Sequence, residues 1–287
     1  MAIMSSRASA RRRCYRGRWP SSSLWGYWFW RGDERGADAD LVGALPGFLL
    51  GSAPEEAFPM WRRALPPIHP AGWRFIAIFA VVTLILFWIA RPLGWLGLFL
   101  TLWCVTFFRN PWRVTPQRDG LVVAPADGIV TFVDEAAPPP ELGMGDAPMR
   151  RIAIFLSVFD VHMNRVPMAG QVVKLAYRKG KFVNAALDKA SSDNERMAIR
   201  ITTEAGPDIA VVQIAGLIAR RIVCALNEGQ AVAAGQHLGL IRFGSRTDIY
   251  LPLDWPCFAL AGQRMVGGET IVADRHAAEG VRQGLVQ

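Results

Sequence analysis

The sequence has few of the residues that usually bind metals or form cross-links. It contains four cysteines and four histidines among 287 residues. The cysteines form neither a CxxC pair nor the dense pattern of a secreted disulfide scaffold, so we expect reduced thiols facing the cytosol. An HExxH motif and a histidine cluster are also absent, and no metal site is predicted.

The sequence also lacks the glycine-rich loops that bind nucleotides, since neither GxGxxG nor a Walker-type motif occurs. The GxSxG motif of hydrolases is missing too, because Ser245 lies in the sequence Phe243-Gly244-Ser245-Arg246. No long apolar run follows the first arginines, so a secretory signal is not predicted. The missing motifs argue against a nucleotide-binding enzyme and against a GxSxG hydrolase.

The composition is apolar and basic. Hydrophobic residues make up 52% of the chain, charged residues 20%, and the formal net charge is +8. This is too apolar for a disordered chain and indicates a globular body with a membrane element. The positive charge would suit nucleic acid or anionic lipid, and charge alone does not choose between them.

The first part of the chain shows no helical or strand period. Residues 1–64 are predicted to form an irregular basic leader. Two interpretations stay open for residues 1–59: a basic tail, or a chain whose translation begins near Met60.

Residues 75–90 and 93–108 form two apolar runs separated by an Arg-Pro pair. A single helix through both would carry a proline at its middle and would exceed the roughly 20 residues that a bilayer requires. We therefore predict two helices joined at residues 91–94, in a membrane-associated hairpin over residues 65–113. A full span, a re-entrant hairpin and a helical hairpin buried in a soluble core all stay open.

Basic residues flank the predicted hairpin at both outer ends, with Arg74 before it and Arg109 and Arg113 after it. Because basic flanks favour the cytoplasmic side, both ends are expected to face the cytoplasm. This predicts a protein of the cell membrane whose remaining domain lies on the cytoplasmic side.

Residues 114–287 have a different sequence pattern, in which short runs of β-forming residues alternate with Gly, Pro and Asp residues. The pattern predicts a compact, mostly β (α+β) domain, and two stretches resemble strands of a barrel-sandwich hybrid. A surface loop is expected over residues 135–148. The predicted strand runs are residues 121–125, 128–135, 151–159, 171–177, 197–204, 208–216, 221–226, 238–243 and 247–253.

A few polar residues are embedded in or directly after these apolar strands. They are Asp127, Asp160, His162 and Ser245. Each has an ordinary structural explanation by itself, because Asp-Gly and Gly-Ser pairs mark turns and a single histidine after a strand is usually structural.

Taken together, the motifs that contain these residues resemble a known family. The chain resembles the phosphatidylserine decarboxylase proenzymes, in their short, archaeal-type branch, over roughly residues 65–275. The motifs are FRNP (108–111), VVAPADGIV (122–130), FLSVFDVHMNRVP (155–167), GKFVNAALDKASSDNER (180–196), GLIARRIV (216–223), GLIRFGSRTDIYLP (239–252) and GGETIVA (267–273).

The resemblance implies that the protein makes its own cofactor. Ser245 would attack the carbonyl of Gly244, and the chain would separate into residues 1–244 (beta chain) and 245–287 (alpha chain). The second fragment would begin with a pyruvoyl group derived from Ser245. The two fragments would remain together as a heterodimer. Glycine at position 244 suits this reaction, because it leaves the carbonyl open and tolerates strained backbone angles.

The resemblance also implies roles for two further residues. Asp127 and His162 occupy the motifs whose Asp and His lie near the serine in the family, Asp127 as the orienting group and His162 as the base. Some relatives carry a second histidine where this chain has Arg165. His162 is therefore expected to serve self-cleavage, decarboxylation or both, and in decarboxylation it would protonate the α-carbon after CO₂ leaves.

The implied reaction is decarboxylation of phosphatidylserine in a membrane to phosphatidylethanolamine, through a Schiff base with the pyruvoyl group. Lys189, Arg196 and Arg246 are candidate ligands for the anionic substrate. Nucleic acid is not needed to explain the positive charge, because basic flanks also attract anionic lipid. Two alternatives stay open: a non-catalytic barrel-sandwich adaptor or carrier, and the same chemistry on archaetidylserine.

Overall fold

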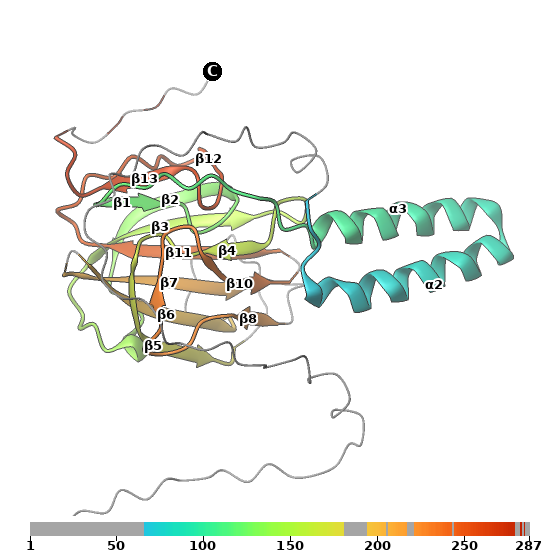
Figure 1. Ribbon diagram of the computed structural model, residues 1–287, viewed down its shortest axis with the longest axis horizontal. Coiled ribbons are helices and arrows are strands. Elements are labelled where there is room, and N and C mark those ends of the chain that lie inside the picture. The colour runs from blue at the N-terminus through green and yellow to red at the C-terminus, as the bar shows by residue number, and fades with distance from the viewer. Residues whose placement is uncertain are drawn as a thin grey trace, which may run out of the picture. The chain divides into compact units, whose positions relative to one another are not determined.

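The computed structural model describes residues 66–180, 194–204, 206–216, 221–242, 244–278, 282 and 284. The predicted leader and Lys189 lie outside these residues. The described part is mostly β, with an N-terminal pair of apolar helices followed by a curled antiparallel sheet, which confirms the predicted fold class (Figure 1).

The two helices match the two apolar runs. A 3₁₀ turn, η1 (Pro70–Gly72), leads into α2 (Trp73–Ile89), and α3 (Arg91–Phe107) follows. The prediction that residues 91–94 connect the helices was wrong, because Ala90 alone is extended between them. The proline of the Arg-Pro pair lies in the first turn of α3, where its missing N–H has no intrahelical partner to lose.

Helices α2 and α3 lie side by side and are joined by hydroxyl groups (Figure 1). The Thr83 and Thr101 hydroxyl oxygens are 2.9 Å apart, and each also lies within hydrogen-bond distance of the carbonyl oxygen four residues earlier in its own helix. Because each hydroxyl has one hydrogen, one of them donates across to the other helix. Gly97 permits this approach, since a Cβ there would lie 2.9 Å from the Thr83 hydroxyl. The helices thus pack through small and polar residues, as helices do in apolar surroundings.

The strands form one eight-stranded antiparallel sheet, in the order β12-β2-β3-β11-β7-β6-β5-β9, and two small sheets, β4-β10-β8 and β1-β13. All nine predicted strand runs contain a strand. The strands are β1 (Leu121–Val123), β2 (Gly128–Ala136), β3 (Met149–Leu156), β4 (Met163–Arg165), β5 (Gly170–Arg178), β6 (Arg196–Thr203), β7 (Asp208–Ala215), β8 (Ile222–Cys224), β9 (Ala231–Val232), β10 (His237–Ile241), β11 (Ser245–Leu251), β12 (Arg264–Met265) and β13 (Ile271–Asp274).

Strand β11 lies near the middle of the large sheet, between β3 and β7, and every one of its residues is buried. Side chains alternate between the two faces of a strand. Accordingly, Ile249 and Leu251 join the main hydrophobic core, which also receives residues from the small sheets, whereas Tyr250 packs in a second cluster on the other face. A short 3₁₀ turn, η2 (Pro140–Leu142), covers that second cluster from within the predicted surface loop.

The base of the helix pair packs against the β domain. Phe107 and Phe108 are fully buried in a cluster with Val161, Met163 and Leu240. Truncating a fully buried phenylalanine typically costs about 3–5 kcal/mol. This contact therefore fixes the segment around residue 162 against the end of α3.

Candidate active site

The peptide bond between Gly244 and Ser245 lies at the beginning of β11. Ser245 pairs with Leu156 of β3 on one side and Ala215 of β7 on the other. The Ser245 side chain is fully buried, and its hydroxyl oxygen has no hydrogen-bond partner among the described residues. A buried hydroxyl normally has a partner, so an unbonded one in the central strand needs a reason other than stability.

Gly244 has a left-handed backbone conformation, with φ +69°. A Cβ at this position would have room, since its nearest neighbour would be a Val158 methyl at 3.8 Å. Glycine is therefore favoured here by backbone conformation and not by crowding. The carbonyl oxygen of Gly244 accepts a hydrogen bond from the Gly216 N–H at 3.1 Å.

His162 is placed over this bond by two hydrogen bonds. The Gly244 N–H lies 3.2 Å from His162 Nε2, so Nε2 must be the acceptor. Its other nitrogen, Nδ1, lies 2.9 Å from the carbonyl oxygen of Asp160 and must carry the hydrogen. The two contacts together assign the neutral Nδ1–H tautomer, with the Nε2 lone pair directed at the main chain of Gly244.

The surroundings keep His162 neutral. Its ring is fully buried, with the Phe107 ring centroid at 4.2 Å. Burial lowers the pKa of His162 to about 4; the contact with Asp160 opposes this shift, and the nearby Arg109 charge adds to it. At neutral pH the imidazole is therefore unprotonated at Nε2, as a general base must be.

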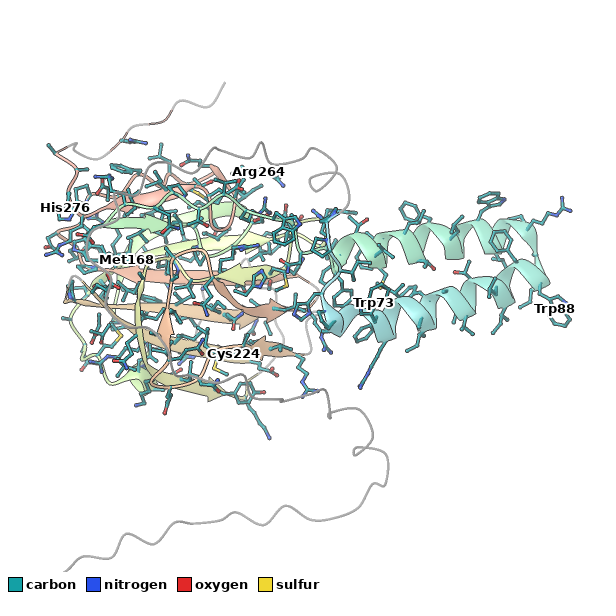
Figure 2. All side chains as sticks on the ribbon, viewed as in Figure 1. Trp73, Trp88, Met168, Cys224, Arg264 and His276 are labelled. Atoms are coloured by element: carbon teal, nitrogen blue, oxygen red, sulfur yellow. The ribbon has the colours of Figure 1, made fainter. Side chains whose placement is uncertain are left out.

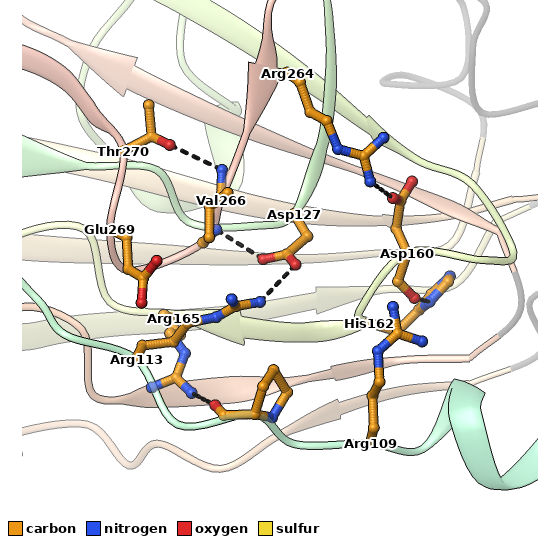
Figure 3. A network of polar contacts seen from close by, with 12 residues as sticks. Arg109, Arg113, Asp127, Asp160, His162, Arg165, Arg264, Val266, Glu269 and Thr270 are labelled. Atoms are coloured by element: carbon orange, nitrogen blue, oxygen red, sulfur yellow. Dashed lines mark hydrogen bonds and ion pairs between the residues drawn. The ribbon is translucent and has the colours of Figure 1, made fainter. Parts of the chain in front are cut away.

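Asp127 belongs to a separate set of contacts (Figure 3). Its carboxylate accepts hydrogen bonds from Arg113 at 2.6 Å and from the Gly267 N–H at 2.7 Å. Burial raises the pKa of Asp127, and the Arg113 charge and the Gly267 hydrogen bond oppose the shift. Among the described residues, the acceptor that orients His162 is the Asp160 carbonyl and not the Asp127 carboxylate.

The Gly244–Ser245 bond and His162, which this geometry brings together, both belong to the motifs that carry the family resemblance. The family model described as phosphatidylserine decarboxylase matches residues 100–273, which include all of these groups. The chain belongs to the phosphatidylserine decarboxylase family.

Two relatives with the name phosphatidylserine decarboxylase proenzyme are closely similar. The protein of Paramagnetospirillum magneticum is 57% identical over 221 residues, which cover 77% of this chain and 92% of that protein. The protein of Cereibacter sphaeroides is 54% identical over 231 residues, covering 80% of this chain and all of that protein. These comparisons confirm the family but give no support to an archaeal-type branch.

Arg165, which occupies the position of the second histidine of some family members, is held by hydrogen bonds to main-chain carbonyl groups. Its guanidinium donates to the carbonyl oxygens of Gly235 and Pro111, both at 2.9 Å. The side chain therefore ties two distant loops together near the Asp127 contacts (Figure 3). Because an arginine keeps its proton at neutral pH, it does not replace a histidine as a base.

Of the three expected substrate ligands, two have carboxylate partners inside the protein. Arg196 makes a two-point contact with Glu141 at 2.6 and 2.8 Å. Arg246 and Asp248 are both fully buried and bonded at 2.7 and 2.9 Å. Both guanidinium groups therefore bind carboxylates of the protein itself. Lys189 lies outside the described residues.

Sequence reasoning did not single out Arg264 of β12. Its guanidinium donates to Asp160 at 2.6 Å, while its side chain is 69% exposed. The same Asp160 also accepts the Ser157 N–H at 2.9 Å, which holds the turn that presents its carbonyl to His162. Arg264 is therefore an accessible cation beside the histidine (Figure 2, Figure 3).

The part of the chain that the structure describes contains no group of three or more His, Cys, Asp or Glu residues that could hold a metal ion.

Proposed function

We propose that this chain is the precursor of an enzyme that decarboxylates phosphatidylserine, and that it cuts itself between Gly244 and Ser245. Family membership supports the reaction, because both relatives carry it in their names, and it favours an enzyme over an adaptor or carrier. The observation that carries the self-cleavage is the hydrogen bond from the Gly244 N–H to Nε2 of a neutral, buried His162.

The cut follows from the groups around Ser245. Its hydroxyl oxygen attacks the Gly244 carbonyl carbon, the bond to the Ser245 nitrogen breaks, and an ester replaces the peptide. Nε2 of His162 takes the hydroxyl proton and returns it to the departing nitrogen; its low pKa leaves Nε2 unprotonated for the first transfer and favours the second. To reach the hydroxyl, Nε2 must release the Gly244 N–H that it accepts in the uncut chain.

The negative charge of this step develops on the Gly244 carbonyl oxygen. The Gly216 N–H already donates to that oxygen at 3.1 Å, so a main-chain donor is in place before the reaction begins. Donors fixed in advance are effective because they need not reorient as charge develops. Removal of the Ser245 α-proton then expels the Gly244 carboxylate from the ester and leaves dehydroalanine at position 245. One water converts the dehydroalanine to a pyruvoyl group with release of ammonia.

Position 245 fits a pyruvoyl group, since its buried hydroxyl, which has no described hydrogen-bond partner, is available as the source. The group supplies a ketone that condenses with the substrate amine, and an adjoining amide carbonyl that takes up the electron pair released with CO₂. His162, which lies over this position, is our candidate for the proton donor to the substrate carbon.

Strand pairing supports a stable heterodimer of the two fragments. The three strands that the structure describes within residues 245–287 pair with strands of the larger fragment: β11 with β3 and β7, β12 with β2, and β13 with β1. The cut would fall at the end of a strand and break none of these ladders. The small fragment would therefore stay folded within the sheet.

The helix pair supports attachment to a membrane. The stretch Pro70–Ile89 is long and apolar enough to cross a bilayer, and α3 is a shorter apolar helix. Trp73 and Trp88 lie at opposite ends of α2, and both are exposed, Trp88 by 89% (Figure 2). Seventeen helical residues measure about 26 Å, close to the roughly 30 Å of a bilayer core, so tryptophans at both ends suit a full span.

The placement of the active site suits a lipid substrate. His162 contacts Phe107 at the base of α3, and Phe159, on the same turn, is 68% exposed. The head group of a lipid held in the bilayer could thus reach the site without leaving the membrane. We propose that the β domain lies on the cytoplasmic side, because Arg74, Arg109 and Arg113 flank the helices at this end.

Arg264 is our candidate ligand for the phosphate or carboxylate of the substrate. It is exposed and adjoins the Asp160 turn, whereas the guanidinium of Arg109 is used by the Thr106 and Phe159 carbonyls. An anionic head group would compete with Asp160 for Arg264 close to His162.

Replacement of the nucleophile tests the proposal. Ser245→Ala should remain one chain on a denaturing gel and be inactive, because no hydroxyl is left for the acyl shift. The unchanged protein should give two fragments, and the smaller one should resist Edman sequencing because its N-terminus carries a ketone instead of an amine. Cutting of the Ser245→Ala chain at the same bond would refute the mechanism.

A further inference from the structure

A row of buried amide and hydroxyl groups lies next to Ser245 in the sheet. Gln213 Nε2 donates to Asn164 Oδ1 at 2.7 Å, and Asn164 Nδ2 donates to the Thr247 hydroxyl oxygen at 3.2 Å. All three side chains are fully buried. Such a row is unusual in the middle of an apolar core, where polar groups lower stability unless every one is bonded.

The row leaves one atom unbonded. Because Gln213 uses its amide nitrogen toward Asn164, its oxygen Oε1 is free to accept, and it has no partner among the described residues. The Ser245 hydroxyl oxygen is also buried and without a described partner.

These two unbonded atoms come from neighbouring positions on one face of the sheet. Gln213 lies directly opposite Thr247, which is two residues from Ser245 and therefore points to the same face of β11. Gln213 and Ser245 are thus diagonal neighbours on adjacent strands, typically about 7–8 Å apart, a separation that a glutamine side chain can bridge in part. Two buried polar atoms without described partners, at neighbouring positions on one face of the sheet, are the kind of groups that ordered water satisfies.

We propose that Gln213, held by Asn164 and Thr247, binds the water that converts position 245 into the pyruvoyl group. The inference rests on the proposed self-cleavage and concerns its last step. Water adds its oxygen to the dehydroalanine carbon that bears the nitrogen. One of its hydrogens goes to the methylene carbon and the other to the nitrogen, and the carbon–nitrogen bond breaks to release ammonia.

A dedicated water site is needed because bulk solvent does not reach position 245. The Ser245 side chain is fully buried in the central strand, with the helix base on one side of His162 and the core around it. Water that hydrolyses this residue must be held inside before the cut or admitted along polar groups. Gln213 is therefore a positioning residue, which acts through the water and leaves the cut to His162 and Ser245.

The test separates the cut from the formation of the ketone. Purified uncut chains are allowed to mature, with cutting followed on gels, ammonia release measured, and the ketone captured with dinitrophenylhydrazine. Gln213→Met has a similar shape but no acceptor; it should cut at an unchanged rate and form the ketone several-fold to about 10-fold more slowly, as expected for one lost hydrogen bond. Its small fragment should carry the mass of the dehydroalanine form.

Gln213→Glu is the matched control, since its buried neutral carboxyl keeps an acceptor and should restore ketone formation. If Gln213→Met does not fold, Thr247→Val removes the end of the row and should delay the ketone in the same way. Ketone formation that keeps pace with cutting in these variants would overturn the inference, and so would slower cutting, which would place Gln213 in the acyl shift. Failure of the unchanged chain to cut would instead refute the proposed function.

Discussion

The two faces of strand β11 differ in whether their buried polar side chains are hydrogen-bonded. On one face, Arg246 and Asp248 are completely buried and bonded to each other at two points. On the other face, Ser245 is equally buried, yet its hydroxyl lacks a described partner. One strand thus carries a satisfied ion pair that holds the fold and an unsatisfied hydroxyl that is available for chemistry. Burial alone does not distinguish the two, but hydrogen bonding does.

The largest effect on the face of β11 that carries Ser245 is expected from His162, the proposed base. His162→Ala should slow self-cleavage, turnover or both by about 10²–10⁴-fold, the usual contribution of a general acid or base. Gel-based cutting rates and CO₂ release measure the two steps separately. A variant that cuts and decarboxylates at normal rates would remove His162 from the mechanism.

Asp127→Asn is the control for His162. The Asp160 carbonyl already fixes the tautomer of the imidazole, so this variant should cut faster than His162→Ala. Equal defects in the two variants would show that Asp127 orients the histidine during the reaction.

The bonded face should respond in stability instead of activity. Asp248→Ala leaves the buried Arg246 charge without its carboxylate, and such a loss typically costs about 3–5 kcal/mol. Urea unfolding in the Ser245→Ala background measures the change on an uncut chain. Replacing Arg246 and Asp248 together with Met and Leu should restore much of the loss, and a double variant as unstable as the single one would argue against an isolated ion pair.

The pH dependence of stability should report the buried histidine. The pKa of His162 is about 4 in the folded chain against 6.5 for an ordinary histidine. Between these values the unfolded chain binds more protons, so the free energy of unfolding falls as pH falls from about 6.5 to 4, by about 3 kcal/mol from this group. In the Ser245→Ala background, His162→Asn should flatten this slope, and an unchanged slope would contradict the assignment.

The smallest effect is expected at Arg264. Its exposed ion pair contributes at most about 1 kcal/mol to stability, so Arg264→Gln should fold and cut normally. If it binds the head group, the KM for phosphatidylserine vesicles should rise several-fold with little change in kcat. An unchanged KM would leave the head group to other cations, and slower cutting would instead tie Arg264 to the Asp160 turn.

The sequence allowed most of the architecture to be predicted, because long apolar or alternating runs carry a period. The missed strands are β4, β9, β12 and β13, each two to four residues long. Strands this short have no period of their own and form because a partner strand is nearby. The helix connection was misplaced for a different reason: a proline in a first helical turn looks, in sequence, like a break.

Within the site, the residues with distinctive motifs could be found from sequence, whereas main-chain contacts could not. The Asp160 carbonyl and the Gly216 N–H leave no mark in the residue types that provide them. The partner of Arg246 could have been found from sequence. Asp248 is two residues further along the same strand, so its side chain points to the same face. Arg196 offered no such signal, since its partner Glu141 is 55 residues away.

The position of the proposed cut changes what unfolding means for this molecule. Before the cut, the sheet unfolds into a single chain that can refold by itself. After the cut, β11, β12 and β13 would belong to a different molecule from the strands with which they pair. Unfolding then separates two species, so the midpoint becomes dependent on concentration and dilution opposes recovery. The mature protein would keep its fold by unfolding slowly, as a state reached only through the intact precursor.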